Sequence, residues 1–246
     1  MGPRDERDLF PEAIRIVGEC KPRAFMFENV APLAGTRFVE YREAIVMAFE
    51  ELGYYVESGL VNAAHFGVPQ DRRRFILVGR RNGPASFPWP SRRDKFITVG
   101  VALEDLMSSR SWPGAKKWAM QANRIAPTIV GGSEKHGGPD LGPTRARREW
   151  ATIRVDGLGI ANGPPDADFP EDGSPRLTLR MAARLQGFPD SWKFAGSKTN
   201  AYRQVGNAFP PPVAEALARA VLEWLDMPAD LSAIEPRQIA LTAVAP

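Results

Sequence analysis

The first eighty residues alternate between stretches with the patterns of strands and of helices. Residues 24–30, Ala-Phe-Met-Phe-Glu-Asn-Val, form a compact apolar run typical of a buried parallel strand. Residues 36–52 repeat apolar side chains at helical spacing and end at Gly53, where a helix C-terminal glycine belongs. Strand-like stretches follow at 54–63 and 74–80. Strand, helix and strand in this order predict an α/β fold with a doubly wound sheet.

The composition changes near residue 82. From there to beyond residue 175 the chain is rich in Gly, Pro, Arg and Trp, although residues 97–106 have the pattern of a strand and a helical turn. Helical patterns return at 180–188 and 212–225. Long loops in a compact protein commonly carry function. The predicted division is an α/β body at 1–81, a loop-rich insert at 82–197, a return to the body at 198–232 and a loose tail at 233–246.

Arginine is concentrated in clusters. The formal net charge is only +3 over 246 residues, but arginines gather at 72–74, 80–81, 92–93 and 145–148. A guanidinium group offers a planar donor fork that suits phosphates and the edges of bases. Such clusters indicate either a polyanionic partner or an ordinary solvated surface, and composition alone does not separate the two.

Cysteine and histidine are scarce. Cys20 is the single cysteine, which excludes an internal disulfide and a cysteine-based zinc site in this sequence. The two histidines, His65 and His136, make a metal centre unexpected. No apolar run approaches the roughly 18 residues that span a bilayer, and the first residues lack the pattern of a signal peptide. We expect a cytoplasmic protein with no metal and no membrane segment.

Glu28 stands near the carboxyl end of the first predicted strand. In open α/β sheets, ligands bind beyond the carboxyl ends of the strands. A carboxyl group that interrupts an apolar run is costly to bury unless it is paired or protonated. A protonated Glu28 would be able to donate to a ring nitrogen, whereas a paired Glu28 would be structural. Position alone leaves both interpretations open.

The segment Pro69-Gln70-Asp71-Arg72-Arg73-Arg74 precedes a predicted strand. If it is extended, the side chains of Gln70, Arg72 and Arg74 point to the same side. Guanidinium groups at that point can clamp a carbonyl oxygen or a phosphate. Without further context, a basic turn that faces water is the preferred interpretation.

Two glycine-containing segments are less informative. Gly206-Asn207, just before Phe-Pro-Pro-Pro and a predicted helix, is interpreted as a tight turn with backbone donors near the top of the sheet. Residues 131–138, Gly-Gly-Ser-Glu-Lys-His-Gly-Gly, lack the lysine and Ser/Thr at the spacing of a phosphate loop. They predict a flexible loop, and a contact with a partner stays open.

Four motifs, in this order, resemble those of the DNA cytosine-5 methyltransferase family. They are Phe-Glu-Asn-Val at 27–30, Pro-Gln-Asp-Arg-Arg-Arg at 69–74, Ala-Arg-Leu-Gln-Gly-Phe-Pro-Asp-Ser-Trp at 183–192 and Gln-Val-Gly-Asn-Ala-Phe at 204–209. None is specific alone, but their order and spacing cover nearly the whole chain. The resemblance implies an incomplete Rossmann-like methyltransferase sheet plus a smaller, loop-rich target-recognition domain.

The resemblance also implies roles for residues in these motifs. Glu28 would hold and protonate ring nitrogen N3 of a cytosine flipped out of the DNA helix. Arg74 would hold the cytosine O2 oxygen, and Arg72 would help to order the site. Gln70 would shape the turn and contribute to DNA binding. Asn207 would lie near the methionine part of the cofactor, S-adenosylmethionine.

The loop-rich insert would recognise double-stranded DNA. Loops between about residues 85 and 178 would enter the major groove and select the sequence. Arg145, Arg147 and Arg148 are candidates for phosphate contacts there, which would make the affinity depend on salt. Arg180 and Arg184, one helical turn apart, match the segment that supports the recognition domain, and we interpret them as structural.

The sequence departs from the family in one respect that decides its chemistry. The family needs a Phe-x-Gly-x-Gly cofactor loop and a Pro-Cys loop whose thiolate attacks carbon 6 of cytosine, and neither occurs here. The opening residues resemble the stretch that follows the Pro-Cys loop. Cys20 lies between the first predicted helix, 9–17, and the 24–30 strand, at the opposite end of that strand from Glu28. We interpret it as a packed thiol and not as the nucleophile.

We therefore predict the carboxy-terminal part of a cytosine-5 methyltransferase of a restriction–modification system, acting on a flipped cytosine. Alone it is expected to be inactive, because an amino-terminal half or subunit must supply the thiolate and most of the cofactor pocket. A truncated piece of a full-length enzyme and a non-catalytic DNA-binding remnant are the alternatives. The isolated sheet should expose an edge or an apolar face, so that the chain alone associates or dissolves poorly.

Overall fold

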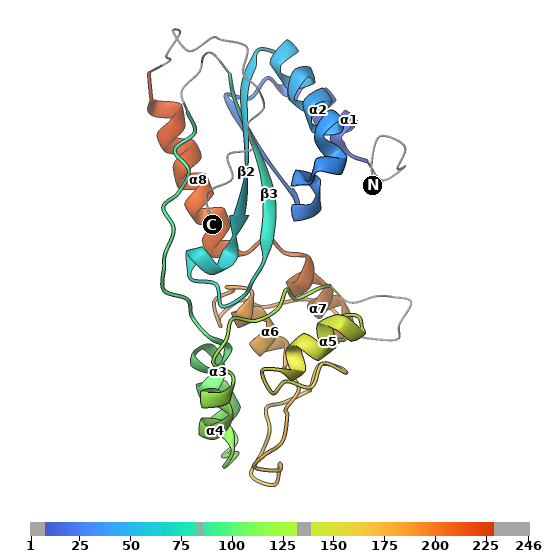
Figure 1. Ribbon diagram of the computed structural model, residues 1–246, viewed down its shortest axis with the longest axis vertical. Helices are drawn as coiled ribbons and strands as arrows, with labels where there is room; N and C mark the ends of the chain where they lie inside the picture. Colours follow the sequence, from blue (N-terminus) through green and yellow to red (C-terminus); the bar gives the residue numbers. More distant parts are fainter. Residues whose placement is uncertain (1–7, 82, 84–85, 132–138, 229–246) are drawn as a thin grey trace. The chain divides into compact units, whose positions relative to one another are not determined.

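The computed structural model describes residues 8–81, 83, 86–131 and 139–228 (Figure 1). The contacts within the chain divide it into two compact units. Unit 1 comprises residues 1–61, 73–91 and 216–246, and unit 2 comprises residues 62–72 and 92–215. The limits of these units differ from the predicted functional boundaries at residues 82 and 198, which stay predictions. The predicted tail at 233–246 lies outside the described residues.

Unit 1 is built on a three-stranded sheet with the strand order β1-β3-β2. The strands are β1 (Ala24–Val30), β2 (Tyr54–Asn62) and β3 (Arg73–Arg81). Each agrees with its predicted range to within one residue at either end. β1 pairs with β3 in antiparallel orientation, not in the parallel orientation predicted for 24–30, because β3 returns through the centre of the sheet.

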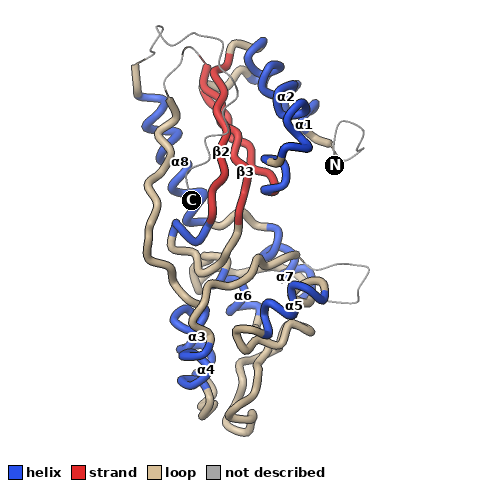
Figure 2. The backbone as a smooth tube through the Cα atoms, in the orientation of Figure 1, coloured by secondary structure: helices blue, strands red, loops and turns tan. Residues whose placement is uncertain are grey.

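Helices cover both faces of this sheet. Helices α1 (Phe10–Cys20) and α2 (Val39–Glu51) lie on one face and α8 (Pro211–Asp226) lies on the other, as Figure 2 shows. The first face has an aromatic core, in which the ring of Phe25 lies 4.4 Å from that of Phe49. On the other face Trp224 packs edge-on against Phe87, with ring centroids 5.2 Å apart. Two covered faces confirm the predicted α/β class.

The turns around the strands follow from local chemistry. Gly53 connects α2 to β2 with φ of +84°, a left-handed conformation that glycine adopts without strain. Residues 87–89 run back along β2, where the carboxylate of Glu57 accepts from Phe87 N at 3.0 Å and from Trp89 Nε1 at 3.4 Å. Burial raises the pKa of Glu57. The chain is thus held to the sheet as it leaves unit 1.

Unit 2 consists of short helices joined by long loops. The helices are α3 (Val99–Ser108), α4 (Ala115–Gln121), α5 (Thr144–Ala151), α6 (Leu179–Leu185) and α7 (Lys198–Asn207). Of the strand and helical turn predicted at 97–106, the strand is wrong: the segment forms α3, which Thr98 begins by accepting from Val101 N. The core of the unit includes the buried rings of Trp118, Trp150 and Tyr202.

Side chains fasten the loops of unit 2 to its helices. Trp118 Nε1 donates to Arg154 O at 2.8 Å. Arg184 of α6 donates to Asp105 at 2.5 Å and also pairs with Asp190. Arg180 donates to the carbonyl of Trp192 at 3.0 Å. These contacts agree with the structural interpretation of Arg180 and Arg184. In the part of the chain that the structure describes, no helix has the length and apolar character to cross a membrane.

Candidate functional site

Glu28 and Arg74 lie on neighbouring strands of unit 1. Glu28 is opposite Ile76 in the β1–β3 register, and Arg74 precedes Ile76 by two residues. The two side chains are therefore diagonal neighbours on one face of the sheet. Arg74 Nε lies 2.7 Å from Glu28 Oε1. The antiparallel return of β3 brings together two residues that the sequence analysis selects separately.

The environment of this pair is partly open to water. The side chain of Glu28 is 35% exposed and that of Arg74 is 14% exposed. Burial lowers the pKa of Arg74, and the neighbouring Glu28 carboxylate opposes this shift. Arg74 Nη1 also donates to Arg73 O at 2.8 Å, which orients the guanidinium plane. Glu28 is thus paired in this structure, as the structural interpretation expects. The donor role requires a ligand to take the place of this ion pair, and a carboxyl group beside an oriented guanidinium then suits a neutral ring that carries both a nitrogen and a carbonyl oxygen.

Arg42 holds the turn that follows Glu28. This side chain of α2 is 5% exposed, and its Nη1 donates to Leu33 O at 2.6 Å and to Gly35 O at 2.8 Å. Burial lowers the pKa of Arg42. Arg42 is not among the predicted site residues, because in the sequence it stands beside Glu40 and Glu43 and resembles an ordinary solvated charge.

Gln70 is completely buried in unit 2. Its Oε1 accepts from Ile129 N at 3.0 Å, and its Nε2 donates to Leu185 O at 3.1 Å and to Gln186 Oε1 at 2.6 Å. The predicted contribution of Gln70 to DNA binding does not agree with this burial, because its amide faces the interior. The position fits the other predicted role, which is to shape the turn.

Arg72, two residues after Gln70, is also buried in unit 2. It is 3% exposed, and its Nη1 donates to Ile129 O at 2.9 Å. Its Nη2 donates to Gly206 O at 2.9 Å and to Ala208 O at 3.0 Å. Gln186, also completely buried, donates to Ala208 O at 2.6 Å. Gln70, Arg72 and Gln186 thus tie the segments around 129, 186 and 207 together. Arg74, the next alternate residue, belongs to unit 1, where it pairs with Glu28.

Asn207 is the exposed last residue of α7. The predicted tight turn at Gly206-Asn207 is wrong, because Ala208 N still donates to carbonyls of the preceding helical turn. Gly206 packs so closely on Gly131 that an added Cβ would lie 2.5 Å from the Gly131 backbone. A Cβ on Gly131 would lie 2.3 Å from Asn207 Oδ1, so the Asn207 carboxamide covers this glycine. An exposed amide offers both a donor and acceptors to a polar ligand.

Helix α5 displays the arginine cluster of the insert. The side chain of Arg145 is 93% exposed, and its Nε lies 3.4 Å from Glu149 Oε1. Arg147 and Arg148 line a shallow surface pocket of about 360 Å³ together with residues 155–158. Arg147 also donates to Thr144 Oγ1 at 3.2 Å. Arg145 and Arg148 are exposed, whereas Arg147 is partly buried, and Asp156 lines the same pocket.

Cys20 ends α1 and is exposed. The prediction of a packed thiol is therefore wrong. It precedes the start of β1, whereas Glu28 stands near the other end of that strand. The flexible loop predicted at 131–138 falls outside the described residues except for Gly131.

Residues 2–223 match the family described as C-5 cytosine-specific DNA methylase. The chain belongs to this family. Type II methyltransferase M.NaeI of Lentzea aerocolonigenes is 50% identical over 229 residues, which are 92% of this chain and 55% of the relative. Type II methyltransferase M.NgoMIV of Neisseria gonorrhoeae is 44% identical over 230 residues, covering 92% and 72%. The chain thus spans about half the length of M.NaeI.

Solved structures of methyltransferases share the fold. The S. pombe Dnmt2 methyltransferase superposes with a TM-score of 0.55 at 16% identity, over 92% of this chain and 77% of that chain. The Entamoeba histolytica methyltransferase EhMeth gives a TM-score of 0.57 at 14% identity, over 91% and 71%. These likenesses and the family match confirm the resemblance found in the sequence and its Rossmann-like class.

Proposed function

We propose that this chain forms the base-binding and target-recognition part of a DNA cytosine-5 methyltransferase of a restriction–modification system. The observation that carries the proposal is the Glu28–Arg74 pair, with 2.7 Å between Arg74 Nε and Glu28 Oε1. Both residues belong to motifs of the family to which the chain belongs, and they come from separate strands. The two Type II relatives support restriction–modification as the setting.

The pair is suited to one edge of a cytosine ring. In this proposal the target cytosine leaves the DNA stack, because its carbons cannot be reached within a duplex. Arg74 donates to the O2 oxygen. The thiolate of another segment adds to carbon 6, and Glu28, in its protonated form, gives its proton to N3 as negative charge develops on the ring. Carbon 5 then accepts a methyl group and loses its own proton to a base, the thiolate leaves carbon 6, and N3 returns its proton to Glu28, which restores the aromatic base. S-adenosylmethionine supplies the electrophilic methyl group when it is bound.

The remaining predicted residues have supporting roles. Arg72 orders the segments around Ile129 and Asn207 within unit 2 through its bonds to Ile129, Gly206 and Ala208. Asn207, held over Gly131, presents its amide to the amino-acid part of S-adenosylmethionine. The arginines of α5 contact backbone phosphates of double-stranded DNA. The donor and acceptor atoms at Asn207 fit the polar end of this cofactor, and no metal is required.

The attacking thiolate must come from another segment. Neither a Pro-Cys loop nor a Phe-x-Gly-x-Gly loop occurs among the 246 residues. We propose that a segment with both loops, on the same polypeptide or on a separate amino-terminal subunit, completes the enzyme. The absence of these two loops also fits the alternative, a non-catalytic DNA-binding remnant. Methyl transfer after such a segment is added would exclude that alternative.

The experiment mixes the chain with an amino-terminal methyltransferase segment that carries both loops and measures labelled methyl incorporation into DNA. Glu28→Gln and Arg74→Ala should each lower the rate by roughly 10²–10⁴-fold, the range for a positioned acid–base group. Arg73→Ala, a neighbouring arginine of β3, is the matched control and should keep most of the rate. Undiminished activity in both site variants would overturn the assignment, and DNA binding without any transfer would support the remnant.

A further inference from the structure

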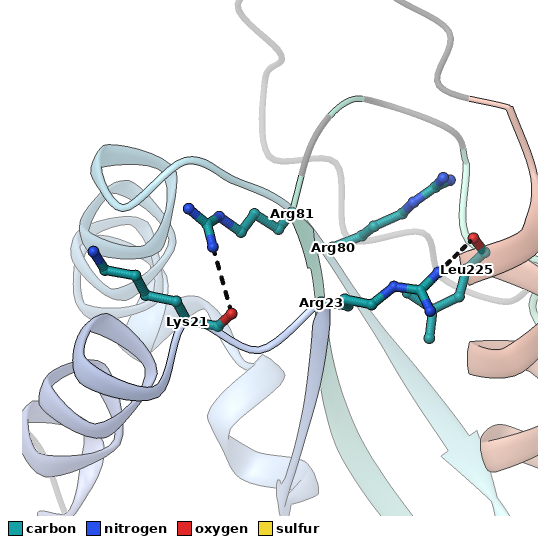
Figure 3. Close-up of a pocket in the computed structure, with 5 residues that line it drawn as sticks. All are labelled: Lys21, Arg23, Arg80, Arg81 and Leu225. Carbon is teal, nitrogen blue, oxygen red and sulfur yellow. Dashed lines mark hydrogen bonds between the residues drawn. The ribbon is translucent and has the colours of Figure 1, made fainter.

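Four basic side chains gather at the end of the unit 1 sheet that is remote from Glu28. Lys21 follows α1, Arg23 precedes β1, and Arg80 and Arg81 end β3 (Figure 3). With Leu225 of α8 they line a pocket of about 200 Å³. At a rise of about 3.3 Å per residue, Arg23 lies roughly 16 Å along the strand from Glu28. The pocket is therefore separate from the proposed base site.

The four side chains extend in two directions (Figure 3). Arg23 and Arg80 reach toward the carboxyl end of α8, where they donate to Leu225 O at 3.4 Å and to Met227 O at 2.5 Å. Cations commonly satisfy the last carbonyls of a helix in this way. Arg81 and Lys21 extend on the side of α1, where Arg81 Nη1 reaches Lys21 O at 3.5 Å, a distance too long for a strong bond.

Capping of α8 does not account for all of these donors. Arg80 is 7% exposed, and its Nη1 is buried with no hydrogen-bond partner. Within the described ranges, no salt bridge joins any of the four cations to a carboxylate. Like charges in one place repel each other, and a buried donor without a partner is unfavourable. Such a cluster is stabilised when an anion enters it.

We propose that this pocket binds a phosphate group. Guanidinium groups bind phosphate through paired, charge-assisted hydrogen bonds, and the lysine adds a point charge. The volume is below the roughly 300–1,000 Å³ of pockets for drug-sized ligands, so it suits one or two phosphate groups. The phosphate is either a diester of the DNA backbone or part of a small free polyphosphate. The proposed base site uses neither, so the pocket is a further binding site; its DNA alternative rests on the proposed function, and its free-polyphosphate alternative does not.

The test uses the full chain and inorganic tripolyphosphate as the probe, in a calorimetric titration. Lys21→Gln with Arg81→Gln removes two exposed cations without touching the cap of α8. The affinity for tripolyphosphate should fall at least tenfold. Arg15→Gln with Arg37→Gln removes the same net charge from exposed positions elsewhere in unit 1 and should leave the affinity within about twofold.

The Arg80→Lys variant tests the buried donor, Arg80 Nη1, separately. It keeps the positive charge but replaces the guanidinium group with an ammonium group. It should weaken tripolyphosphate binding severalfold at unchanged net charge, while circular dichroism reports that the chain remains folded. Wild-type affinity in a folded Arg80→Lys protein would contradict the proposed role of the pocket.

A second arm distinguishes the sources of the phosphate through the affinity for duplex DNA at several salt concentrations. If a backbone phosphate occupies the pocket, the Lys21/Arg81 variant binds DNA more weakly, and its salt slope is smaller by about two. If a free polyphosphate occupies it, DNA affinity equals that of the control variant while tripolyphosphate affinity still falls. The proposal is overturned if both affinities of the variant equal those of the Arg15/Arg37 control.

Discussion

The side-chain amide of Gln70 donates to the side-chain oxygen of Gln186 over 2.6 Å, although 116 positions separate the two residues in the sequence. Both are completely buried. A buried amide whose bonds are all made within the protein links its neighbours strongly, because losing one partner leaves the other unsatisfied. The pair is therefore a structural connection within unit 2 that supports the segments around Arg72 and Asn207.

Replacement of Gln70 by Leu should destabilise unit 2. The change keeps the volume but leaves Ile129 N and Leu185 O without their partner, which costs about 1–3 kcal/mol. Urea denaturation followed by tryptophan fluorescence measures the loss. Gln204→Ala is the control, because Gln204 is exposed and makes one bond to Ala195 O. Equal midpoints for the two variants would contradict the role of Gln70.

Replacement of Arg42 by Met should loosen the turn after Glu28. The carbonyls of Leu33 and Gly35 lose their donor, so backbone amides at 31–38 should exchange with solvent faster. Hydrogen exchange with mass spectrometry measures this change. Arg37→Met, which alters an exposed arginine beside Phe38, should leave the exchange unchanged. If Glu28 depends on this turn, methyl transfer falls in the Arg42 variant while DNA affinity stays constant.

Acid should weaken unit 2 through Asp190. The bond from Arg184 holds the pKa of Asp190 below its usual value of 3.8. A carboxyl group with a lowered folded-state pKa contributes stability above its unfolded pKa and loses it as the pH falls through the folded value. The urea concentration at the midpoint of unfolding should therefore decrease as the pH is lowered below about 4. The Asp190→Asn variant should show a smaller decrease. Asp168→Asn, at an exposed aspartate, is the control.

The salt dependence of DNA binding should report on α5. If Arg147 and Arg148 contact phosphates, their joint replacement by Gln lowers the affinity equally for every sequence and reduces the salt slope by about two. Fluorescence anisotropy with two unrelated duplexes at several salt concentrations measures both effects. Arg110→Gln, at an arginine of unit 2 outside α5, serves as the comparison. An unchanged slope would exclude α5 from the DNA contact.

Local patterns predict the elements of unit 1 well. The apolar run at 24–30 and the stretches at 54–63 and 74–80 are the observed strands. The predicted burial of 24–30 is wrong, because β1 is an edge strand of the three-stranded sheet and only its Phe25 is buried. The family motifs also identify Glu28 and Arg74. The direction in which β3 pairs with β1 is not encoded locally, since it depends on which strand takes the central position.

The missed features are tertiary in origin. Gly206-Asn207 has the composition of a turn, but packing of Gly206 on Gly131 keeps it helical. Arg42 and Gln186 are buried through contacts with carbonyls that are distant or in turns, which a periodic pattern does not reveal. Cys20 is exposed, whereas its residue type alone favours a buried thiol.

The central position of β3 sets the order in which unit 1 assembles on the ribosome. β1 cannot pair with β3, and Glu28 cannot pair with Arg74, until residues 73–81 have been synthesised. The far face of the sheet stays uncovered for longer still, because α8 begins at Pro211. Nascent chains therefore present an apolar sheet face throughout the synthesis of unit 2, a period in which chaperones have a substrate and in which a stalled chain would aggregate.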